Sequence, residues 1–120
     1  MFVFPYKDDN PTRSFPLLTW IFIVANLWVF FAWQFPLDDD GHIKYYSSFA
    51  FHPATFFGQF AFEAPKDILW VWSTVFTSMF SHGGIAHVLG NMLFLYLYGD
   101  NVEDAMGKFR FVLFYLTCGL

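Results

Sequence analysis

Two long runs without a charged residue dominate the pattern of the chain. Residues 14–37 form the first run, of 24 residues, and residues 68–99 form the second, of 32 residues. About 20 apolar residues are enough to cross a bilayer as a helix, so residues 14–37 predict a first transmembrane helix. The second run is too long for one straight span, and Gly83 and Gly84 divide it. We therefore predict a second transmembrane helix over residues 82–99.

The segments around these two helices differ in character. Residues 38–81 begin with an acidic turn and are then rich in aromatic residues, which favours a long interfacial loop with short helices lying in the membrane interface. The last part of this loop, residues 68–80, is rich in β-branched and aromatic residues and favours an extended or re-entrant piece. In residues 108–120, Lys108 and Arg110 precede an apolar run that predicts the start of a third helix.

Glycine and acidic residues predict where the second helix ends. Gly99 is a natural residue to terminate it. Asp100, with Glu103 three residues later, resembles a helix N-cap and its acidic partner. We therefore predict a separate short helix that begins after Asp100 and ends at Gly107.

Composition strengthens the membrane interpretation. Apolar residues make up 57% of the chain and charged residues only 13%, whereas soluble domains carry roughly a quarter charged residues. The net charge is −4, and the six Lys and Arg residues are scattered, so no surface for nucleic acid is predicted. The single cysteine, Cys118, has no partner for an internal disulfide.

Three polar side chains stand inside the second apolar run: His82, His87 and Asn91. Ionisable or amide groups at membrane depth are costly, so by default they mark function and face the protein interior. His87 and Asn91 are four residues apart, which places both on one face of a helix, one turn apart. His82 precedes the glycine break, so we expect it at the mouth of the helix.

Spacing alone leaves the chemistry of these residues open. The zinc-protease motif needs histidines four residues apart with a glutamate beside the first, whereas His82 and His87 are five apart with Gly83 in that place. We therefore expect no metal. Ser81 and His82 are sequential neighbours that point in different directions, which makes a poor nucleophile–base couple. His87 and Asn91 are typical oxyanion donors, but spacing alone favours the alternative that they only hydrogen-bond helices together.

Other residues predict contacts between helices. Asn26 lies in the middle of the first helix, where an amide typically forms an interhelical hydrogen bond worth roughly 1 kcal/mol. Ala86 and Gly90 form a pair of small residues four apart, which would let another helix approach the second helix closely.

Two motifs carry a family resemblance: HGGIAHVLGNM at residues 82–92 and YGDNVED at residues 98–104. Together they resemble the second transmembrane helix of bacterial rhomboid intramembrane serine proteases. The run GKFRFVLFYLTCG at residues 107–119 resembles the start of that family's third helix. The first helix and the preceding DDNPTR at residues 8–13 are also similar, so the resemblance spans nearly the whole chain and is weakest in the loop.

The resemblance implies an all-α integral membrane fold, a rhomboid-like bundle of six helices with a site open to the extracytoplasmic side. By it, His87 and Asn91 line the oxyanion hole and His82 lies near that hole. The family's nucleophile is a Ser in a G-x-S-G motif on the fourth helix, and its base is a His on the sixth. The implied substrates are transmembrane proteins, cleaved without a cofactor in the lipid bilayer. The implied location is the bacterial inner membrane, with a cytoplasmic N-terminus.

The chain departs from this pattern in one major respect. None of its serines stands in a G-x-S-G motif, and no histidine follows His87. We therefore expect an N-terminal fragment with two spanning helices and the start of a third, which carries the oxyanion-hole helix and hydrolyses nothing alone. The alternative function is that of a non-catalytic rhomboid-like membrane protein that binds client transmembrane helices.

Overall fold

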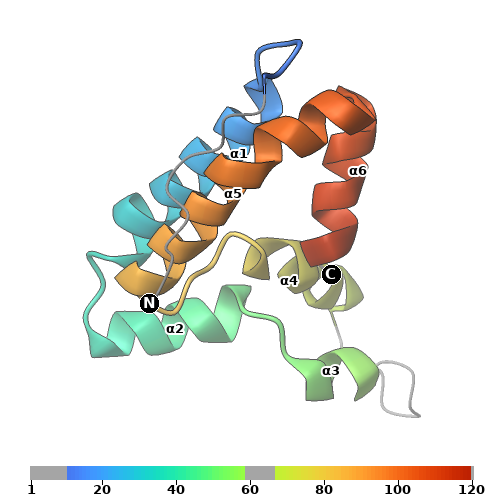
Figure 1. The fold of residues 1–120 in the computed structure, drawn as a ribbon. Helices are drawn as coiled ribbons and strands as arrows, with labels where there is room; N and C mark the ends of the chain where they lie inside the picture. The colour runs from blue at the N-terminus through green and yellow to red at the C-terminus, as the bar shows by residue number, and fades with distance from the viewer. Residues whose placement is uncertain (1–10, 59–66, 120) are drawn as a thin grey trace, which may run out of the picture.

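The computed structural model describes residues 11–58 and 67–119, which are helical with short connections and contain no strand. The residues of the DDNPTR motif before Pro11 lie outside this part. The helices follow in the order α1 (Leu17–Trp28), the π-helix η1 (Val29–Gln34), α2 (Asp39–Phe49), α3 (Pro53–Gly58), α4 (Ile68–Ser78), α5 (Ile85–Met106) and α6 (Lys108–Gly119). As Figure 1 shows, α1 and α5 lie side by side and antiparallel, α6 turns back from the end of α5, and α2 to α4 gather at the opposite end.

The pairing of α1 with α5 follows from the spacing of buried residues along both helices. On α1 and η1 the buried positions recur every three or four residues, which places them on one helical face: Thr19, Ile23, Asn26, Phe30 and Gln34. Ile23 and Phe30 form the core cluster with Val88 and Met92 of α5. The buried face of the first helix therefore packs along the second.

The N-terminal end of α1 is capped by a side chain of α5. Pro16, the N-cap residue, provides no side-chain hydrogen bond. Instead the Glu103 carboxylate accepts hydrogen bonds from the Leu18 amide (3.1 Å), the Thr19 amide (2.8 Å) and the Thr19 hydroxyl (2.9 Å). Glu103 is only 2% exposed. A carboxylate at this position also interacts favourably with the positive end of the helix dipole. Glu103 of α5 therefore stabilises the start of α1 both by hydrogen bonds and by its charge.

Asp104, the next residue, binds the chain just before α1. Its carboxylate accepts from the Arg13 amide (3.0 Å), the Ser14 amide (3.1 Å) and the Ser14 hydroxyl (3.0 Å). The hydrogen bond from the Arg13 amide is the main reason that the pKa of Asp104 lies below its usual value, and the Ser14 bonds add to it. This contact is therefore complete above the ordinary pKa of Asp and is lost as the pH falls through the lowered value.

The predicted end of the second helix is wrong. α5 continues through Gly99, and Gly107, with a φ of 81°, ends it. Gly99 instead permits close approach to α1, because a Cβ at this position would meet Thr19 Cγ2 at 2.8 Å. The predicted capping pair of Asp100 and Glu103 is also wrong, since both residues lie inside α5 and Glu103 caps α1.

The extended conformation considered for residues 68–80 is wrong as well, because residues 68–78 form α4. The Asp67 carboxylate accepts from the Trp70 amide at 3.0 Å and caps the helix. This local hydrogen bond and the contacts with α2 and α3 outweigh the weak strand preference of the β-branched and aromatic residues. α2 and α3 are the short helices of the connection, and Asp38 caps α2 by accepting from the Gly41 amide at 2.8 Å.

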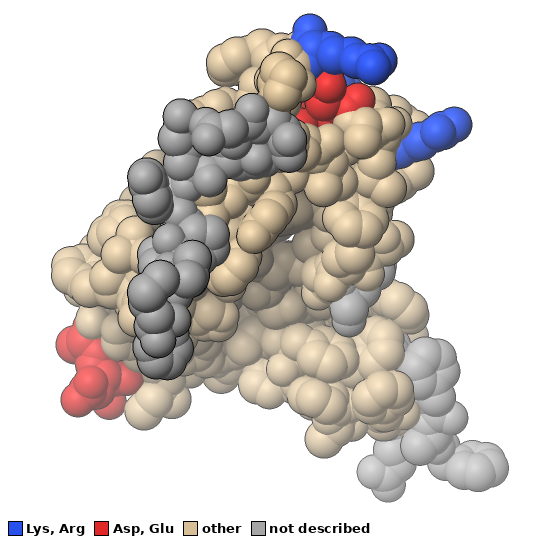
Figure 2. Space-filling model, viewed as in Figure 1, with Lys and Arg blue, Asp and Glu red and all other residues tan. Residues whose placement is uncertain are grey.

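Charged residues among the described part of the chain gather in two places on the face drawn in Figure 2. Acidic and basic residues lie where α5 leads into α6, and a second acidic group lies at the start of α2. Among the described residues, one helical stretch is long and apolar enough to cross a membrane, the 18 residues Leu17–Gln34. α5, which contains most of the stretch predicted as a second span at residues 82–99, does not meet this criterion.

The close approach of α1 and α5 predicts opposite effects at two glycines of α5. Gly99→Ala is expected to destabilise the protein by about 1–3 kcal/mol, because the added methyl group must displace the Thr19 side chain. Gly90→Ala is the matched control, since nothing lies within 4 Å of the added Cβ. Its better helix propensity should stabilise the protein by up to about 1 kcal/mol. Thermal unfolding in detergent measures both changes, and equal shifts would contradict the packing of α1 against Gly99.

The cap on α1 predicts a larger effect at Glu103 than at Asp104. Glu103→Ala leaves the Leu18 and Thr19 donors without an acceptor, at a cost of about 1–3 kcal/mol for each buried group. The Asp104 donors lie at the surface, where water can replace the carboxylate. Glu103→Gln keeps a hydrogen-bond acceptor without the charge, so its thermal stability should lie between that of the parent protein and that of Glu103→Ala. A larger loss of thermal stability in Asp104→Ala than in Glu103→Ala would show that the buried cap is not the dominant contact.

Candidate functional site

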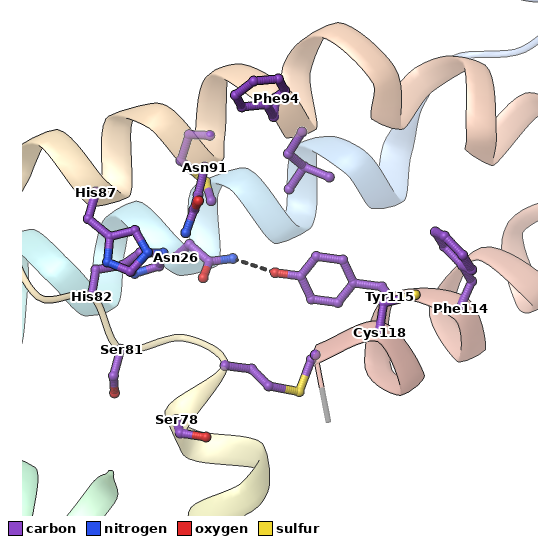
Figure 3. Close-up of a pocket in the computed structure, with 14 residues that line it drawn as sticks. Asn26, Ser78, Ser81, His82, His87, Asn91, Phe94, Phe114, Tyr115 and Cys118 are labelled. Carbon is purple, nitrogen blue, oxygen red and sulfur yellow. Dashed lines mark hydrogen bonds between the residues drawn. The ribbon is translucent and has the colours of Figure 1, made fainter. Parts of the chain in front are cut away.

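A cavity of about 530 Å³ lies between α1, α5, α6 and the turn that precedes α5. Apolar residues form part of its wall, and polar side chains reach it from each of these elements (Figure 3). The polar side chains are Asn26, Ser78, Ser81, His82, His87, Asn91 and Tyr115. The three residues singled out in the sequence, His82, His87 and Asn91, therefore meet at one cavity.

His87 and Asn91 contribute the polar part of the α5 wall. They lie one turn apart on α5 and both line the cavity (Figure 3). Both side chains are exposed, and within the described part of the chain neither forms a hydrogen bond. An imidazole and an amide each carry an N–H group, so this wall can donate hydrogen bonds to a group that enters the cavity.

His82 has a different environment, in the turn between α4 and α5. It is 4% exposed, and its ring centroid lies 5.3 Å from that of His87, with an angle of 74° between the ring planes. On its other side the ring meets Phe30 edge to face at 6.5 Å. His82 is thus the buried neighbour of His87, positioned between that ring and the core.

Gln34, which the sequence analysis did not identify, holds the backbone of His82. Its side-chain oxygen accepts from the His82 amide at 3.0 Å, and its side-chain nitrogen donates to the His82 carbonyl at 3.1 Å. Tyr46 of α2 donates to the same carbonyl at 3.1 Å. The sequence holds only a weak signal, a second amide side chain later in the same apolar run as Asn26, because the π-helix that brings Gln34 to the face of Asn26 has no local sequence mark.

Asn26 joins α1 to α6 across the cavity. Its side-chain nitrogen donates to the Phe22 carbonyl at 2.7 Å and to the Tyr115 hydroxyl at 2.9 Å (Figure 3). The rings of Phe22 and Tyr115 also stack, with centroids 3.9 Å apart. The interhelical hydrogen bond predicted for Asn26 is therefore confirmed, and it fixes the distance between two walls of the cavity.

Ser81 does not form a catalytic couple with His82. Its hydroxyl lies 3.1 Å from the Tyr45 hydroxyl and donates to the Thr77 carbonyl at 3.2 Å. Its side chain points away from the His82 ring (Figure 3). Among residues 11–58 and 67–119, no group of three or more His, Cys, Asp or Glu residues is placed to hold a metal ion.

Residues 69–120 match the family model of the rhomboid domain. This part of the chain, residues 69–120, is therefore similar to the rhomboid domain. The match begins within α4 and includes α5, α6 and the three residues His82, His87 and Asn91, whereas α1 lies outside it. Neither a curated protein nor a solved structure matches the chain.

The domain match and the helical structure agree with each other. The described residues form helices and no strand, consistent with a helical membrane fold, so the all-α fold predicted from the resemblance is confirmed. The rhomboid family, to which residues 69–120 are similar, comprises intramembrane serine proteases and their relatives, which act on membrane proteins in a lipid bilayer. The individual roles of His82, His87 and Asn91 stay predictions.

Proposed function

We propose that His87 and Asn91, with His82 beside them, form the oxyanion hole of a bacterial rhomboid endopeptidase that cleaves transmembrane segments of membrane proteins. One observation carries this proposal. His87 and Asn91 line the same cavity one turn apart, and their N–H groups have no acceptor within the described residues. Side chains that only bonded helices together would be expected to find their partners on another helix, as Asn26 does.

The proposed chemistry is stabilisation of a tetrahedral intermediate. When a serine attacks the scissile carbonyl, its oxygen becomes an anion and hydrogen bonds to it strengthen. A neutral imidazole needs only one N–H to donate, so His87 can act without a change of charge. Asn91 can donate to the same oxygen from the next turn of α5. His82 lies behind the His87 ring and is suited to orienting it.

The reacting serine and its base are not among the residues of this cavity. The 120 residues contain no G-x-S-G motif and no histidine after His87. Ser81 has its hydroxyl hydrogen-bonded elsewhere. Covalent catalysis needs a nucleophile beside a base, so in the proposed enzyme a segment outside these residues contributes both. We propose that this chain alone hydrolyses nothing.

The proposed substrate class agrees with the rest of the cavity wall. Apolar side chains also line the cavity, including Met92, Phe94, Leu95 and Phe114. A scissile peptide bond between apolar residues can therefore place its carbonyl at His87 and Asn91 while its side chains contact the apolar wall. This arrangement suits a transmembrane segment better than a charged soluble peptide.

A fusion tests the oxyanion role directly. Residues 1–120 joined to the remaining helices of a bacterial rhomboid protease, with its G-x-S-G serine and histidine base, should cleave a transmembrane substrate. His87→Ala or Asn91→Ala in this fusion should lower kcat by roughly 10²–10³, because an oxyanion donor acts mainly in the transition state. Rates at saturating substrate and thermal unfolding in detergent are measured for each variant.

Two controls make the result decisive. Leu89→Ala lies on the same helix and is exposed, but it does not line the cavity, so its kcat should stay near the parent value. The unfused chain should give no product and take up no fluorophosphonate label. Near-normal kcat in both cavity variants, together with a lowered melting temperature, would mean that His87 and Asn91 are structural. Cleavage by the unfused chain would require a nucleophile within residues 1–120.

We also propose that the N-terminus is cytoplasmic, as the family resemblance implies. The charged ends of the molecule support a transmembrane placement, with Asp104 and its partners at one side and the α2 end at the other. Alkaline phosphatase is active only outside the cytoplasm, so a fusion after Gly41 should be active and one after Lys108 inactive. The reverse pattern would show the opposite orientation.

A further inference from the structure

The amide of Gln34 is fully buried at the end of the candidate membrane span, with 0% exposure. A buried amide is costly unless its donor and its acceptor are both paired. Gln34 satisfies both at one residue, because its oxygen and nitrogen bond the amide and the carbonyl of His82. One side-chain amide thus bonds both backbone groups of a single residue, as a neighbouring strand does in a β-sheet.

The turn after His82 provides little packing of its own. Gly83 and Gly84 connect His82 to the start of α5. A Cβ on Gly83 would meet only the His87 ring, at 3.9 Å, and a Cβ on Gly84 would meet nothing within 4 Å. We therefore expect the position of the turn to depend on the residues before it. The nearest of these is His82, whose backbone is hydrogen-bonded by the buried Gln34 side chain.

The π-helix explains how Gln34 reaches this point. The Phe35 amide donates to the Phe30 carbonyl at 2.7 Å, a bond that spans five residues. This wider turn keeps Gln34 on the face that already carries Asn26 and Phe30, and such turns recur at functional sites. The same Phe30 ring contacts His82 edge to face.

We propose that Gln34, supported by Tyr46, is a positioning residue of the site. It fixes the backbone of His82 and thereby the placement of the His82 ring against His87, at a centroid distance of 5.3 Å. This role rests on the proposed oxyanion function, in which the orientation of His87 decides where its N–H points. The hydrogen bonds of Gln34 hold the backbone of the site, and Gln34 itself touches no reacting atom.

Histidine ring signals in nuclear magnetic resonance test the proposal in the chain as it exists, without hydrolysis. The chain has four histidines, and His52 serves as an internal reference. In ¹³C,¹⁵N-histidine-labelled protein, Gln34→Leu should shift the ring signals of His82 and His87 and leave those of His52 in place. Thr19→Val is the matched control. It removes one buried hydrogen bond at the opposite end of α1 and should lower the melting temperature without moving either signal.

Each outcome decides the proposal. If Gln34→Leu lowers the melting temperature but leaves the His82 and His87 signals unmoved, Gln34 only stabilises the fold and the proposal is overturned. Tyr46→Phe removes a single hydroxyl that donates to the His82 carbonyl and should shift the His82 signal in a folded protein. An unmoved His82 signal in Tyr46→Phe overturns the proposal even where Gln34→Leu fails to fold. The proposed oxyanion function is tested separately by the His87→Ala and Asn91→Ala fusions. Near-normal kcat in those fusions would overturn the oxyanion function without changing the nuclear magnetic resonance result for Gln34.

Discussion

The carboxylate of Glu103 is the contact on which the arrangement of the helices depends. It accepts hydrogen bonds from the first amides of α1 and is itself buried, in the last turn of α5. Gly99, one turn earlier, lets the two backbones come close enough for these bonds to form. The buried amides at the start of α1 are therefore paired by a side chain of the neighbouring helix. This contact and the core packing of Ile23 and Phe30 against Val88 and Met92 together align α1 along α5.

The opposite end of the same helix pair carries the candidate site. Because α1 and α5 are antiparallel, the alignment fixed by Glu103 brings Gln34 beside the turn that starts α5. The Asn26–Tyr115 bond adds α6 as the third wall. The cavity thus lies between helices whose relative positions are supported by buried hydrogen bonds, while His87 and Asn91 form no hydrogen bond with the residues that the structure describes. Rigid surroundings and unpaired donors are the combination that electrostatic stabilisation of an anion requires.

Local patterns in the sequence were sufficient for some of these features. The apolar run with Asn26, and the four-residue spacing of His87 and Asn91, follow from helix geometry and from the cost of polar groups in a membrane. Gly99 and Glu103 were misread because their local signals are those of a helix end and a capping box. Their actual partners lie on α1, about 85 residues away in sequence for Glu103, and no local pattern records such a contact.

Gln34 escaped prediction for a related reason. Its importance depends on a π-turn that changes which face of the helix it occupies, and on a partner backbone in a distant turn. A single glutamine at the end of an apolar run resembles an ordinary residue at the membrane interface. The residues of α4 were also misjudged from local patterns. The Asp67 cap before them favours a helix and outweighs the preference of their β-branched and aromatic side chains for an extended conformation.

Holding α1 at Thr19 and again at Gln34 constrains the number of residues between these two points. A π-turn is the form that a helix takes when it accommodates one additional residue, and η1 lies directly before the second point. Conversion of this turn to ordinary α-helical geometry without the loss of a residue would rotate Gln34 away from His82 while leaving the Glu103 cap intact. Related chains that preserve both contacts are therefore expected either to keep this length together with a π-turn, or to be one residue shorter here and form an ordinary α-helix.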